Sequence, residues 1–384
     1  MRRAISERVA PFIAFGVSDS GERRQLFYEG QTEQKAPPDF GELYFDLASL
    51  TKVISTTSWC YELCAAGALS LAEPLGEKLP ELSGALARAP LSDLLSHRSG
   101  LPAHRPFYEG FAGPRRAGGE PRGFKARIRQ MICRSPLEHL PGEVECYSDL
   151  GFLLLEWLCE RAARRSLEER WATLPLHCAE GAGFHFRPLA PDSPAERAQE
   201  ATHSRVSARG PAPLAPRWRG ARCYVPTERC PWRERLLCAE VHDDNCWLMG
   251  GVAGHAGLFG TLPQVLAFGE EIIRAYHHRG GPFAAQAAVL REAFQPARSS
   301  RGGSFLLGWD SPSSPPAYSS AGRGFSARSV GHLGFTGTSL WLDLEREVAM
   351  VLLSNRVCPS RDGGAGIRWL RPQLHDAAWA FLQR

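Results

Sequence analysis

The sequence predicts an α/β (α+β) fold, in which an antiparallel sheet flanked by helices is joined to a mostly helical lobe. A hairpin pattern near the start of the chain is the first observation, with strand-like runs at 12–17 and 25–28 around the polar turn 19–22. Helix-like periodicity in the middle of the chain is the second, first from 49 to about 66 and again after 149. Three more strand-like runs lie near the other end, at 329–335, 338–344 and 348–354.

An amphipathic helix pattern at 367–382 follows these last runs, with Leu370, Leu374 and Phe381 on one face. Because strand signals occur at both ends of the chain, we expect the two ends to build one sheet that helices cover. Residues 1–48 and 241–384 are therefore predicted to form an α/β lobe. Residues 49–240 are predicted to form a mostly helical lobe with long loops.

Three stretches interrupt the regular patterns. Residues 103–123 and 185–236 are rich in proline and arginine, and residues 298–320 are dense in serine, glycine and proline. The first two are expected to be surface loops, either solvated insertions or segments that rim a functional cleft and set its specificity. The third is expected to connect the middle of the chain to the last strands.

The bulk composition is that of a globular protein. At 384 residues the chain exceeds the size at which one hydrophobic core keeps growing. Its 43% hydrophobic and 22% charged residues are ordinary globular values. A formal charge of +4 is small for this length and indicates no nucleic-acid partner.

The cysteines and the N-terminus bear on the cellular compartment. The 11 cysteines are an odd number without C-x-x-C spacing, which favours reduced thiols over a disulfide scaffold. Their spacing also fits no structural zinc pattern, so no metal is expected. We find no apolar run long enough for a signal peptide or a membrane span. We therefore expect a cytoplasmic protein, or a periplasmic one if a native leader has been removed.

The most informative stretch is Ser49-Leu50-Thr51-Lys52, at the junction of an apolar run and a helix-like pattern. Residues three apart share a face of a helix, so Lys52 is expected beside Ser49. A hydroxyl at a helix start with an amine in reach is one recognised arrangement for a nucleophilic serine. Taken alone, the tetrad is more often a solvated helix start, so its context decides.

Two further motifs supply that context. In Pro141–Phe152 a turn leads into Tyr147-Ser148-Asp149, which opens a strongly apolar helix. In Gly331–Asp343 a strand containing His332-Leu333-Gly334 is followed by a glycine-containing turn and another strand. A serine with a lysine one turn later, a polar pair on a second element and a basic residue before glycine on a strand form a three-part pattern.

This pattern resembles that of the β-lactamase-related serine hydrolases, the group of class C β-lactamases, D-alanyl-D-alanine carboxypeptidases, D-aminopeptidases and family VIII-type carboxylesterases. The resemblance runs in the expected order from about residue 8 to the C-terminus. It implies a β-lactamase/transpeptidase-like fold with the active site in the cleft between the two lobes. Further stretches that resemble the group are 95–102, 241–245 and 250–259.

The resemblance implies catalytic roles for Ser49, Lys52 and Tyr147. Ser49 would attack a carbonyl carbon to form an acyl-enzyme, and Tyr147 would relay the proton to the leaving group and later activate water. Lys52 would accept the proton of Ser49, which requires the pKa of its amine to fall by about 3 units from about 10.4. Burial and a protonated His332 nearby would both lower it.

By the same resemblance, the oxyanion hole consists of the backbone N–H groups of Ser49 and Phe335. Gly334 would let the substrate backbone lie close to the strand. Asp149 is expected either to cap the apolar helix that follows it or to bond within the active site. His332 is expected to bind substrate in the cleft, with a strand-surface position as the alternative.

Three other histidines, His97, His242 and His255, lie in family-like loops, where we expect them to stabilise turns rather than to catalyse. The third motif departs from the lysine- or histidine-threonine-glycine of relatives, because position 333 is leucine. Histidine is a weaker anion anchor than lysine, and leucine has no hydroxyl for a substrate carboxylate. The hydroxyl of Thr336 or Thr338, or a loop arginine, could replace it.

We therefore predict a serine hydrolase, either an esterase or a D-Ala-D-Ala carboxypeptidase-like enzyme, with weak β-lactamase activity. The alternative is a catalytically weak or silent penicillin-binding-like protein that binds a peptide or a protein partner. The expected ligand is a small-molecule or peptide substrate, without cofactor, nucleic acid or membrane. The sequence does not determine the oligomeric state.

Overall fold

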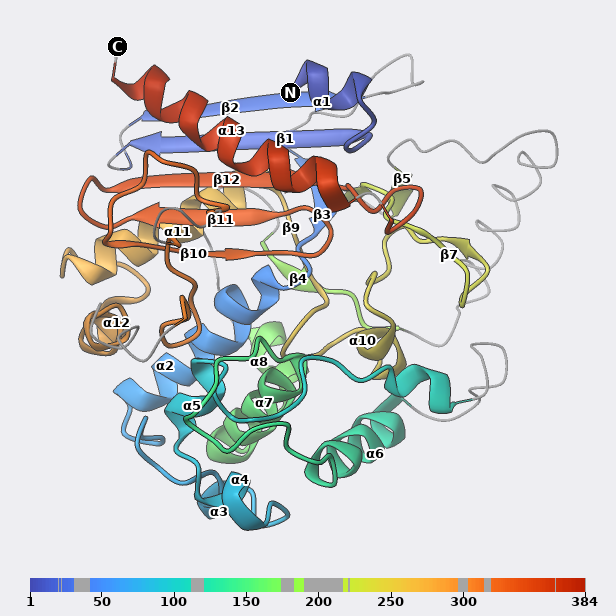
Figure 1. Cartoon of the computed structure of the whole chain (residues 1–384), viewed down its shortest axis with the longest axis vertical. Helices are drawn as coiled ribbons and strands as arrows, with labels where there is room; N and C mark the ends of the chain where they lie inside the picture. Colours follow the sequence, from blue (N-terminus) through green and yellow to red (C-terminus); the bar gives the residue numbers. More distant parts are fainter. Residues whose placement is uncertain are drawn as a thin grey trace.

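A computed structural model shows two stacked regions, a sheet sandwiched by helices and a helical region beneath it (Figure 1). The structure describes residues 1–19, 21, 23–30, 42–111, 121–173, 183–189, 217–219, 222–295, 303–313, 319–362 and 364–383. Much of the proline- and arginine-rich stretches and parts of the 298–320 connector and of the 19–22 turn lie outside these residues. None of the described helices combines the length and apolar character needed to cross a bilayer.

The main sheet has five antiparallel strands in the order β10-β11-β12-β1-β2. Both ends of the chain meet in it, because Ile13 of β1 lies opposite Ser354 of β12. This confirms the predicted antiparallel sheet. Its strands are β1 (Phe12–Asp19), β2 (Arg23–Gly30), β10 (Ser329–Leu333), β11 (Ser339–Asp343) and β12 (Val348–Ser354).

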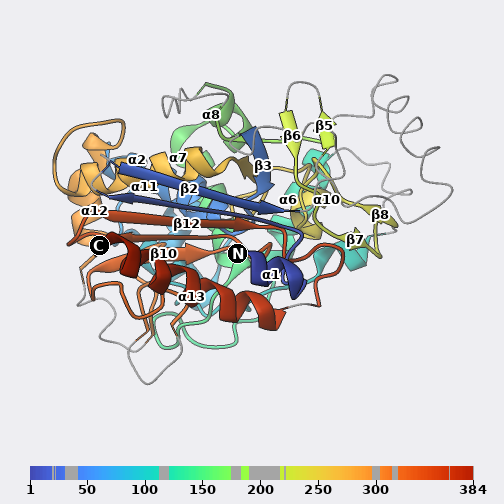
Figure 2. The ribbon, with the colours of Figure 1, turned by 90° about the horizontal axis from the view of Figure 1, so that it is seen from above.

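Both faces of the sheet are covered by helices, as the view from above shows (Figure 2). Successive side chains of a strand point to opposite faces. Accordingly Ile13, Phe15 and Val17 pack in one cluster with α13, whereas Phe12 and Ala14 pack in the other with α11. β12 is buried along its whole length because it lies between these two layers. The two covering helices are α11 (Leu262–Tyr276) and α13 (Gly364–Leu382).

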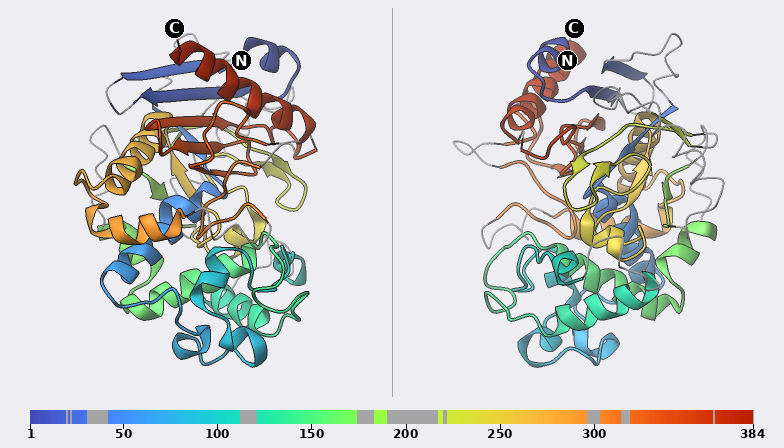
Figure 3. Two further views of the ribbon diagram at one scale, coloured as in Figure 1. Left: turned by 60° about the vertical axis from the view of Figure 1, so that its left-hand side comes forward. Right: turned by 90° about the vertical axis from the view of Figure 1, so that its right-hand side faces the viewer.

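The helical region contains α7, a long apolar helix buried at its centre, around which shorter helices pack (Figure 3). Its helices are α2 (Ser58–Ala65), α3 (Leu75–Lys78), α4 (Gly84–Arg88), α5 (Leu91–Leu95), α6 (Pro121–Cys133), α7 (Asp149–Ala163) and α8 (Leu167–Thr173). The remaining helices of the described chain are α1 (Arg2–Ser6), α10 (Asp244–Leu248), α12 (Ala287–Ala293) and the 3₁₀ turns Phe107–Gly110 and Ala284–Gln286.

The helix predicted from residue 49 contains a π-helical turn, η2 (Lys52–Thr57), which continues directly into α2. A π turn closes backbone hydrogen bonds between residues five apart. At its end the Ser58 hydroxyl adds a side-chain bond to the carbonyl of Val53 at 2.8 Å. Such turns are frequent at functional sites. All six residues of η2, including Lys52, are buried.

A second sheet was not predicted and has the strand order β4-β9-β3-β6-β5. It draws short strands from the region that we predicted as helix and loop, which corrects that part of the prediction. Its strands are β3 (Leu43–Asp46), β4 (His185–Phe186), β5 (Arg217–Arg219), β6 (Arg222–Tyr224) and β9 (Leu258–Gly260), and a separate hairpin consists of β7 (Arg229–Cys230) and β8 (Arg235–Leu236). The proposed lobe boundaries at residues 48 and 241 stay predictions.

Candidate active site

Ser49 stands on a tight turn between β3 and the helical segment that begins at residue 50. The residue before it, Ala48, has a left-handed φ of 47°, which is strained for a residue with a side chain. The buried carboxylate of Asp46 fixes this turn by accepting the backbone N–H of Ala48 at 2.8 Å and that of His242 at 2.6 Å. A carboxylate thus ties the turn to a distant loop.

Two threonines in the connection between β10 and β11 also hold this turn. The hydroxyl of Thr336 donates to the carbonyl of Asp46 at 2.8 Å, and that of Thr338 donates to the carbonyl of Leu47 at 3.1 Å. Both threonines are completely buried. The expectation that one of these hydroxyls replaces the missing substrate contact at position 333 is therefore wrong, because both already serve the turn before Ser49.

Lys52 is buried, and its amine has three hydrogen-bond acceptors. It donates to Ser49 Oγ at 3.1 Å, to Asp149 Oδ1 at 2.7 Å and to the carbonyl of His255 at 3.1 Å. An ammonium group has three N–H donors, so this arrangement satisfies the charged form completely. The sequence had predicted the contact between Lys52 and Ser49 but not the other two.

The electrostatics of Lys52 differ from the expectation. Burial alone would lower the pKa of the Lys52 amine, but the charge of Asp149 and the contact with Tyr147 outweigh burial and raise the pKa above its ordinary value. In the resting site Lys52 is therefore charged rather than neutral. The expectation failed because it counted desolvation and left out an anionic partner.

Tyr147 lies next to both residues. Its ring centroid is 4.9 Å from Lys52 Nζ, and its phenol is close enough to Lys52 and Ser49 for both groups to act on its pKa. Burial raises the pKa of the Tyr147 phenol, although the neighbouring charge of Lys52 acts in the opposite direction. The structure thus brings a hydroxyl, an ammonium and a neutral phenol together, while their catalytic roles stay predictions.

Asp149 is an active-site residue rather than a helix cap. The N-cap of α7 is Ser148, whose hydroxyl accepts the N–H of Gly151 at 3.2 Å. Asp149 instead binds Lys52 through Oδ1 and lies 3.3 Å from Nδ1 of His104 through Oδ2. Burial would raise the pKa of the Asp149 carboxyl, but Lys52 and His104 hold it well below its ordinary value.

His104 is a site residue that sequence reasoning missed. It lies in the proline-, glycine- and arginine-rich loop after Pro102, and 44% of its side chain is exposed. The hydrogen bond to Asp149 raises the pKa of the His104 imidazole in spite of its partial burial. The surrounding composition predicted only a loop, and no motif distinguished this histidine from its neighbours.

His332 lies in the wall of the cleft, as predicted, but it is neutral. Burial, together with the charge of Lys52, lowers the pKa of its imidazole to about 3. Its Nδ1–H donates to the carbonyl of Leu333 at 2.8 Å, so its Nε2 is an unprotonated acceptor. The expectation that a charged His332 lowers the pKa of Lys52 or anchors an anion is therefore wrong.

Gly334 is required for packing. A Cβ at this position would overlap Thr338 Oγ1 and would lie 2.7 Å from the carbonyl oxygen of Leu47. These two atoms form the hydrogen bond from Thr338 to Leu47 that fixes the turn before Ser49. Any side chain at 334 would therefore push the third motif away from Ser49, whether or not the substrate also lies close to the strand.

The predicted oxyanion donors are the backbone N–H groups of Ser49 and Phe335. Within the described chain neither N–H donates to another residue. Phe335 is held by Arg356, whose Nε donates to its carbonyl at 2.7 Å and whose guanidinium lies 4.3 Å from its ring centroid. Half of the Phe335 side chain is exposed, so its ring is available to contact a bound ligand.

These groups line one cleft of about 860 Å³, which is within the range of small-molecule sites, roughly 300–1,000 Å³. Its wall includes Ser49, Tyr147, Asp149, His332 and Gly334 of the predicted residues, together with His104. Lys52 is behind this wall and reaches the cleft through Ser49. The structure thus places every side chain predicted for the site in or directly behind one cleft.

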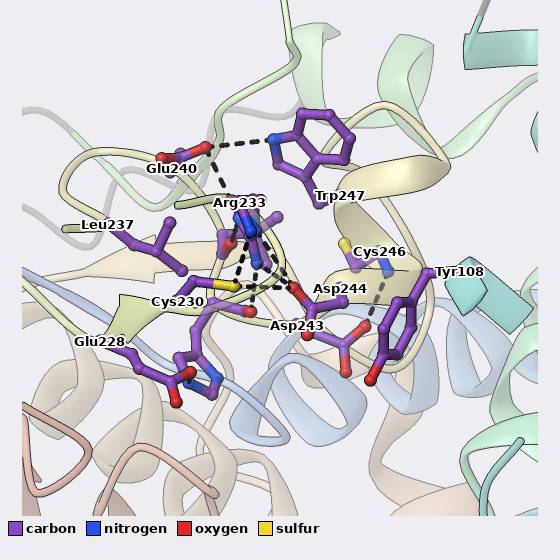
Figure 4. A network of polar contacts seen from close by, with 12 residues as sticks. Tyr108, Glu228, Cys230, Arg233, Leu237, Glu240, Asp243, Asp244, Cys246 and Trp247 are labelled. Atoms are coloured by element: carbon purple, nitrogen blue, oxygen red, sulfur yellow. Dashed lines mark hydrogen bonds and ion pairs between the residues drawn. The ribbon is translucent and has the colours of Figure 1, made fainter. Parts of the chain in front are cut away.

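A network of polar contacts (Figure 4) lies beside the cleft, because Asp243 and Asp244 of the network also line the cleft wall. Arg233 donates to Asp244 Oδ1 at 3.1 Å and 2.8 Å and to the carbonyls of Val241 and His242. On the other side of the same loop, Asp243 accepts from His255 at 2.9 Å. The network fixes the loop whose His242 N–H holds Asp46, so it supports the Ser49 turn indirectly.

His242 and His255 have carboxylate partners in these loops. His242 Nε2 lies 2.9 Å from Glu228 Oε2, and His255 Nε2 lies 2.9 Å from Asp243 Oδ1. Neither imidazole contacts Ser49 in the structure. In the described part of the chain, no three histidine, cysteine or acidic side chains are grouped so that they could hold a metal ion.

Comparison with known proteins agrees with this geometry. A family model described as Beta-lactamase matches residues 1–373. The chain is 27% identical to a putative D-alanyl-D-alanine carboxypeptidase of Escherichia coli, over 86% of this chain and 73% of the relative. It is 26% identical to an N-acetylmuramyl-L-alanine amidase of Bacillus subtilis, over 86% and 72% respectively. The structure of D-alanine carboxypeptidase AmpC from Burkholderia cenocepacia is similar in fold, with a TM-score of 0.63, 15% identity and coverage of 98% and 96%.

Proposed function

Because the chain belongs to the beta-lactamase family of serine hydrolases, we propose that it forms an acyl-enzyme at Ser49 and hydrolyses an ester, an amide or a D-amino-acid peptide. The observation that carries this proposal is the contact of Ser49 Oγ with Lys52 Nζ at 3.1 Å, beside Tyr147, whose ring centroid is 4.9 Å from the same Nζ. The nucleophile, two proton-transfer groups and the open cleft are thus in one place.

The proposed reaction begins with attack of Ser49 Oγ on the substrate carbonyl carbon. The proton of Ser49 passes to the Tyr147–Lys52 pair, and the N–H groups of Ser49 and Phe335 stabilise the oxyanion. The same pair returns the proton to the leaving group as the acyl-enzyme forms, and water then releases the acid. Since the resting pair holds both of its protons, the reactive form is the one that has lost one of them.

The substrate is proposed from the wall around His332. This imidazole is neutral, Leu333 has no hydroxyl, and the hydroxyls of Thr336 and Thr338 are already used. The strand itself therefore lacks the cation and hydroxyl that would hold the carboxylate of a β-lactam strongly, which leaves this contact to arginines elsewhere in the cleft wall, such as Arg368. We therefore expect β-lactam hydrolysis to be weak. The two relatives, whose names describe amide-cleaving activities, support a peptide or amide substrate beside simple esters.

Active-site labelling tests the proposal directly. Purified protein is incubated with a fluorophosphonate or with a fluorescent penicillin, and intact mass measures the adduct. We expect a single adduct with at least one probe on the wild-type chain and none on Ser49→Ala. A screen of nitrophenyl esters, D-alanyl peptides and nitrocefin then separates esterase, peptidase and β-lactamase activities. An adduct that persists in Ser49→Ala would contradict the assigned nucleophile.

A catalytically weak protein that binds a peptide or protein partner is the second candidate. The ion pair between Lys52 and Asp149, at 2.7 Å, favours it because this pair holds the proton that catalysis must release. Under this alternative the wild-type chain forms no adduct with either probe from pH 7 to pH 10. An adduct in that range rules it out.

A further inference from the structure

The segment 97–103 and the segment that contains Tyr147 pair closely, although they are about fifty positions apart in the chain. The backbone N–H of Asp149 donates to the carbonyl of Ala103 at 2.9 Å, and the hydroxyl of Ser148 donates to the carbonyl of Pro102 at 2.7 Å. The segment 97–103 therefore forms a support behind the second motif. We asked which residue of this support acts on Tyr147 itself.

His97 is that residue. Its carbonyl accepts the N–H of Cys146 at 2.8 Å, and its Nδ1 accepts the N–H of Ser148 at 3.0 Å. The residues immediately before and after Tyr147 are thus both hydrogen-bonded to His97. Its ring also faces the Tyr147 ring, with 4.5 Å between the two centroids.

The surroundings of His97 fix its tautomer and its orientation. Because Nδ1 accepts a backbone N–H, the proton of the neutral ring is on Nε2. The rings of Phe152 and Phe305 lie 5.1 Å and 4.6 Å from its own centroid, and only 1% of the residue is exposed. Burial holds the pKa of the His97 imidazole well below its ordinary value, so it stays neutral over the working range of pH.

The backbone of His97 has an uncommon conformation. Its φ of 55° lies in the left-handed region, which most residues other than glycine avoid and which asparagine, aspartate and histidine tolerate better. A histidine held there at the end of α5 gains two backbone contacts and one ring contact with the second motif. It does not line the cleft, so it acts through Tyr147 rather than on the substrate.

We propose that His97 is a positioning residue for the reaction, which holds the Tyr147 hydroxyl between Ser49 and Lys52 by fixing the backbone on both sides of Tyr147. This inference rests on the proposed function, since it assigns His97 to the proton transfer at Ser49. It assigns His97 no proton-transfer step of its own.

The test compares His97→Asn with His97→Ala. Asparagine keeps an acceptor atom in the place of Nδ1 and tolerates a left-handed backbone, whereas alanine offers no acceptor. The rate constant for labelling of Ser49 by a fluorophosphonate is expected to fall about 100-fold in His97→Ala, which is the scale for misplacing a catalytic group by about 1 Å. His97→Asn should stay within about fivefold of the wild type, because the hydrogen bond to Ser148 is retained.

A double-mutant cycle with Tyr147→Phe separates positioning from general structural damage. If His97 acts through the Tyr147 hydroxyl, His97→Ala should slow labelling little further in the Tyr147→Phe background. His375→Ala is the matched control, because His375 is equally buried but lies on α13 away from the cleft. It should leave the labelling rate unchanged even where it lowers thermal stability.

Several outcomes would overturn the inference. Labelling of His97→Ala at the wild-type rate would do so, and so would an equal slowing in the Tyr147→Phe background. If His97→Ala does not fold, His97→Gln takes its place, because it fills the space without an acceptor at the same position. Equal rates for His97→Gln and His97→Asn would then also contradict the inference. A wild-type chain that is not labelled at all would instead reject the proposed function.

Discussion

At the scale of single residues, the ion pair between Lys52 and Asp149 controls the pH dependence expected of this site. Asp149 raises the pKa of Lys52, and in the proposed reaction the active form of the Tyr147–Lys52 pair has lost a proton. The activity kcat/KM is therefore expected to rise with pH into the alkaline range. This direction is opposite to the one expected if a charged His332 held the substrate.

The substitution Asp149→Asn tests this assignment. Asparagine keeps a hydrogen-bond acceptor for Lys52 but removes the negative charge, so the pKa of Lys52 should fall. The rising limb of the profile of kcat/KM against pH should move to lower pH by about 1–3 units, the usual effect of a neighbouring opposite charge. An unchanged limb would show that Asp149 does not set the protonation of the pair. The matched control is His104→Gln, which leaves the charge of Asp149 in place.

The candidate site could be found in the sequence where chemistry depends on local spacing. The distance of three residues from Ser49 to Lys52 places both on one helical face, and the structure joins them at 3.1 Å. The protonation states of Lys52 and His332 were predicted wrongly, because they depend on residues that are distant in the sequence. The charge of Lys52 is set by Asp149, and the neutrality of His332 is set by burial.

At the scale of elements, one buried carboxylate connects the helical region to the loop that supports Lys52. Glu156 of α7 accepts the N–H of Gly254 at 2.8 Å and pairs with Lys125 at 2.5 Å and with Arg129 at 3.5 Å. The next residue after Gly254 provides the carbonyl that accepts from Lys52. The position of Lys52 thus depends on a contact within the helical region.

Removing this carboxylate should destabilise the protein. Glu156→Ala leaves the N–H of Gly254 without its acceptor and removes one carboxylate from Lys125 and Arg129, which both keep Glu160, so the expected cost is about 1–3 kcal/mol. Urea unfolding should show that loss in the free energy of unfolding, together with slower labelling of Ser49. The matched control is Glu168→Ala, which removes a more exposed carboxylate 3.5 Å from the same Lys125 and should cost only about 0–1 kcal/mol. Equal losses in the two variants would contradict the prediction.

The main sheet could be predicted at this scale because its strands are long enough to show their pattern. The run at 348–354 was predicted with the bounds that β12 has, and the closing helix begins at Gly364 rather than at 367. The second sheet was missed because its strands have two to four residues, too few for periodicity to distinguish from a loop. The π turn at Lys52–Thr57 was missed for another reason, since tertiary contacts decide it and no local composition marks it.

At the scale of the whole molecule, buried neutral histidines should make the fold sensitive to acid. The pKa of His332 is about 3 and that of His375 about 4, both lowered by burial. An unfolded histidine binds a proton near pH 6.5, so the unfolded state takes up more protons than the folded state below that pH. The stability due to a neutral buried histidine is complete above about pH 6.5 and is lost as the pH falls towards the folded pKa.

Each of these histidines should cost about 2 kcal/mol of stability when the pH falls from 7.5 to 5. Urea unfolding of wild type and His375→Gln at both values measures this difference, because glutamine does not titrate. The variant should lose about 2 kcal/mol less than the wild type over the same interval. If both lose the same amount, His375 is not neutral and buried in solution as the structure has it.

The order of strands in the main sheet has a consequence for the synthesis of the protein. β1 is paired on one side with β2, but its other neighbour is β12, whose Ser354 faces Ile13. The threonines that fix the nucleophile's turn also come from this late part of the chain. During synthesis, Ser49 therefore emerges from the ribosome long before the residues that fix the position of its turn. Hydrolytic activity is therefore expected only after strands β10 to β12 have been synthesised and have joined the sheet, so an incomplete chain should be inactive.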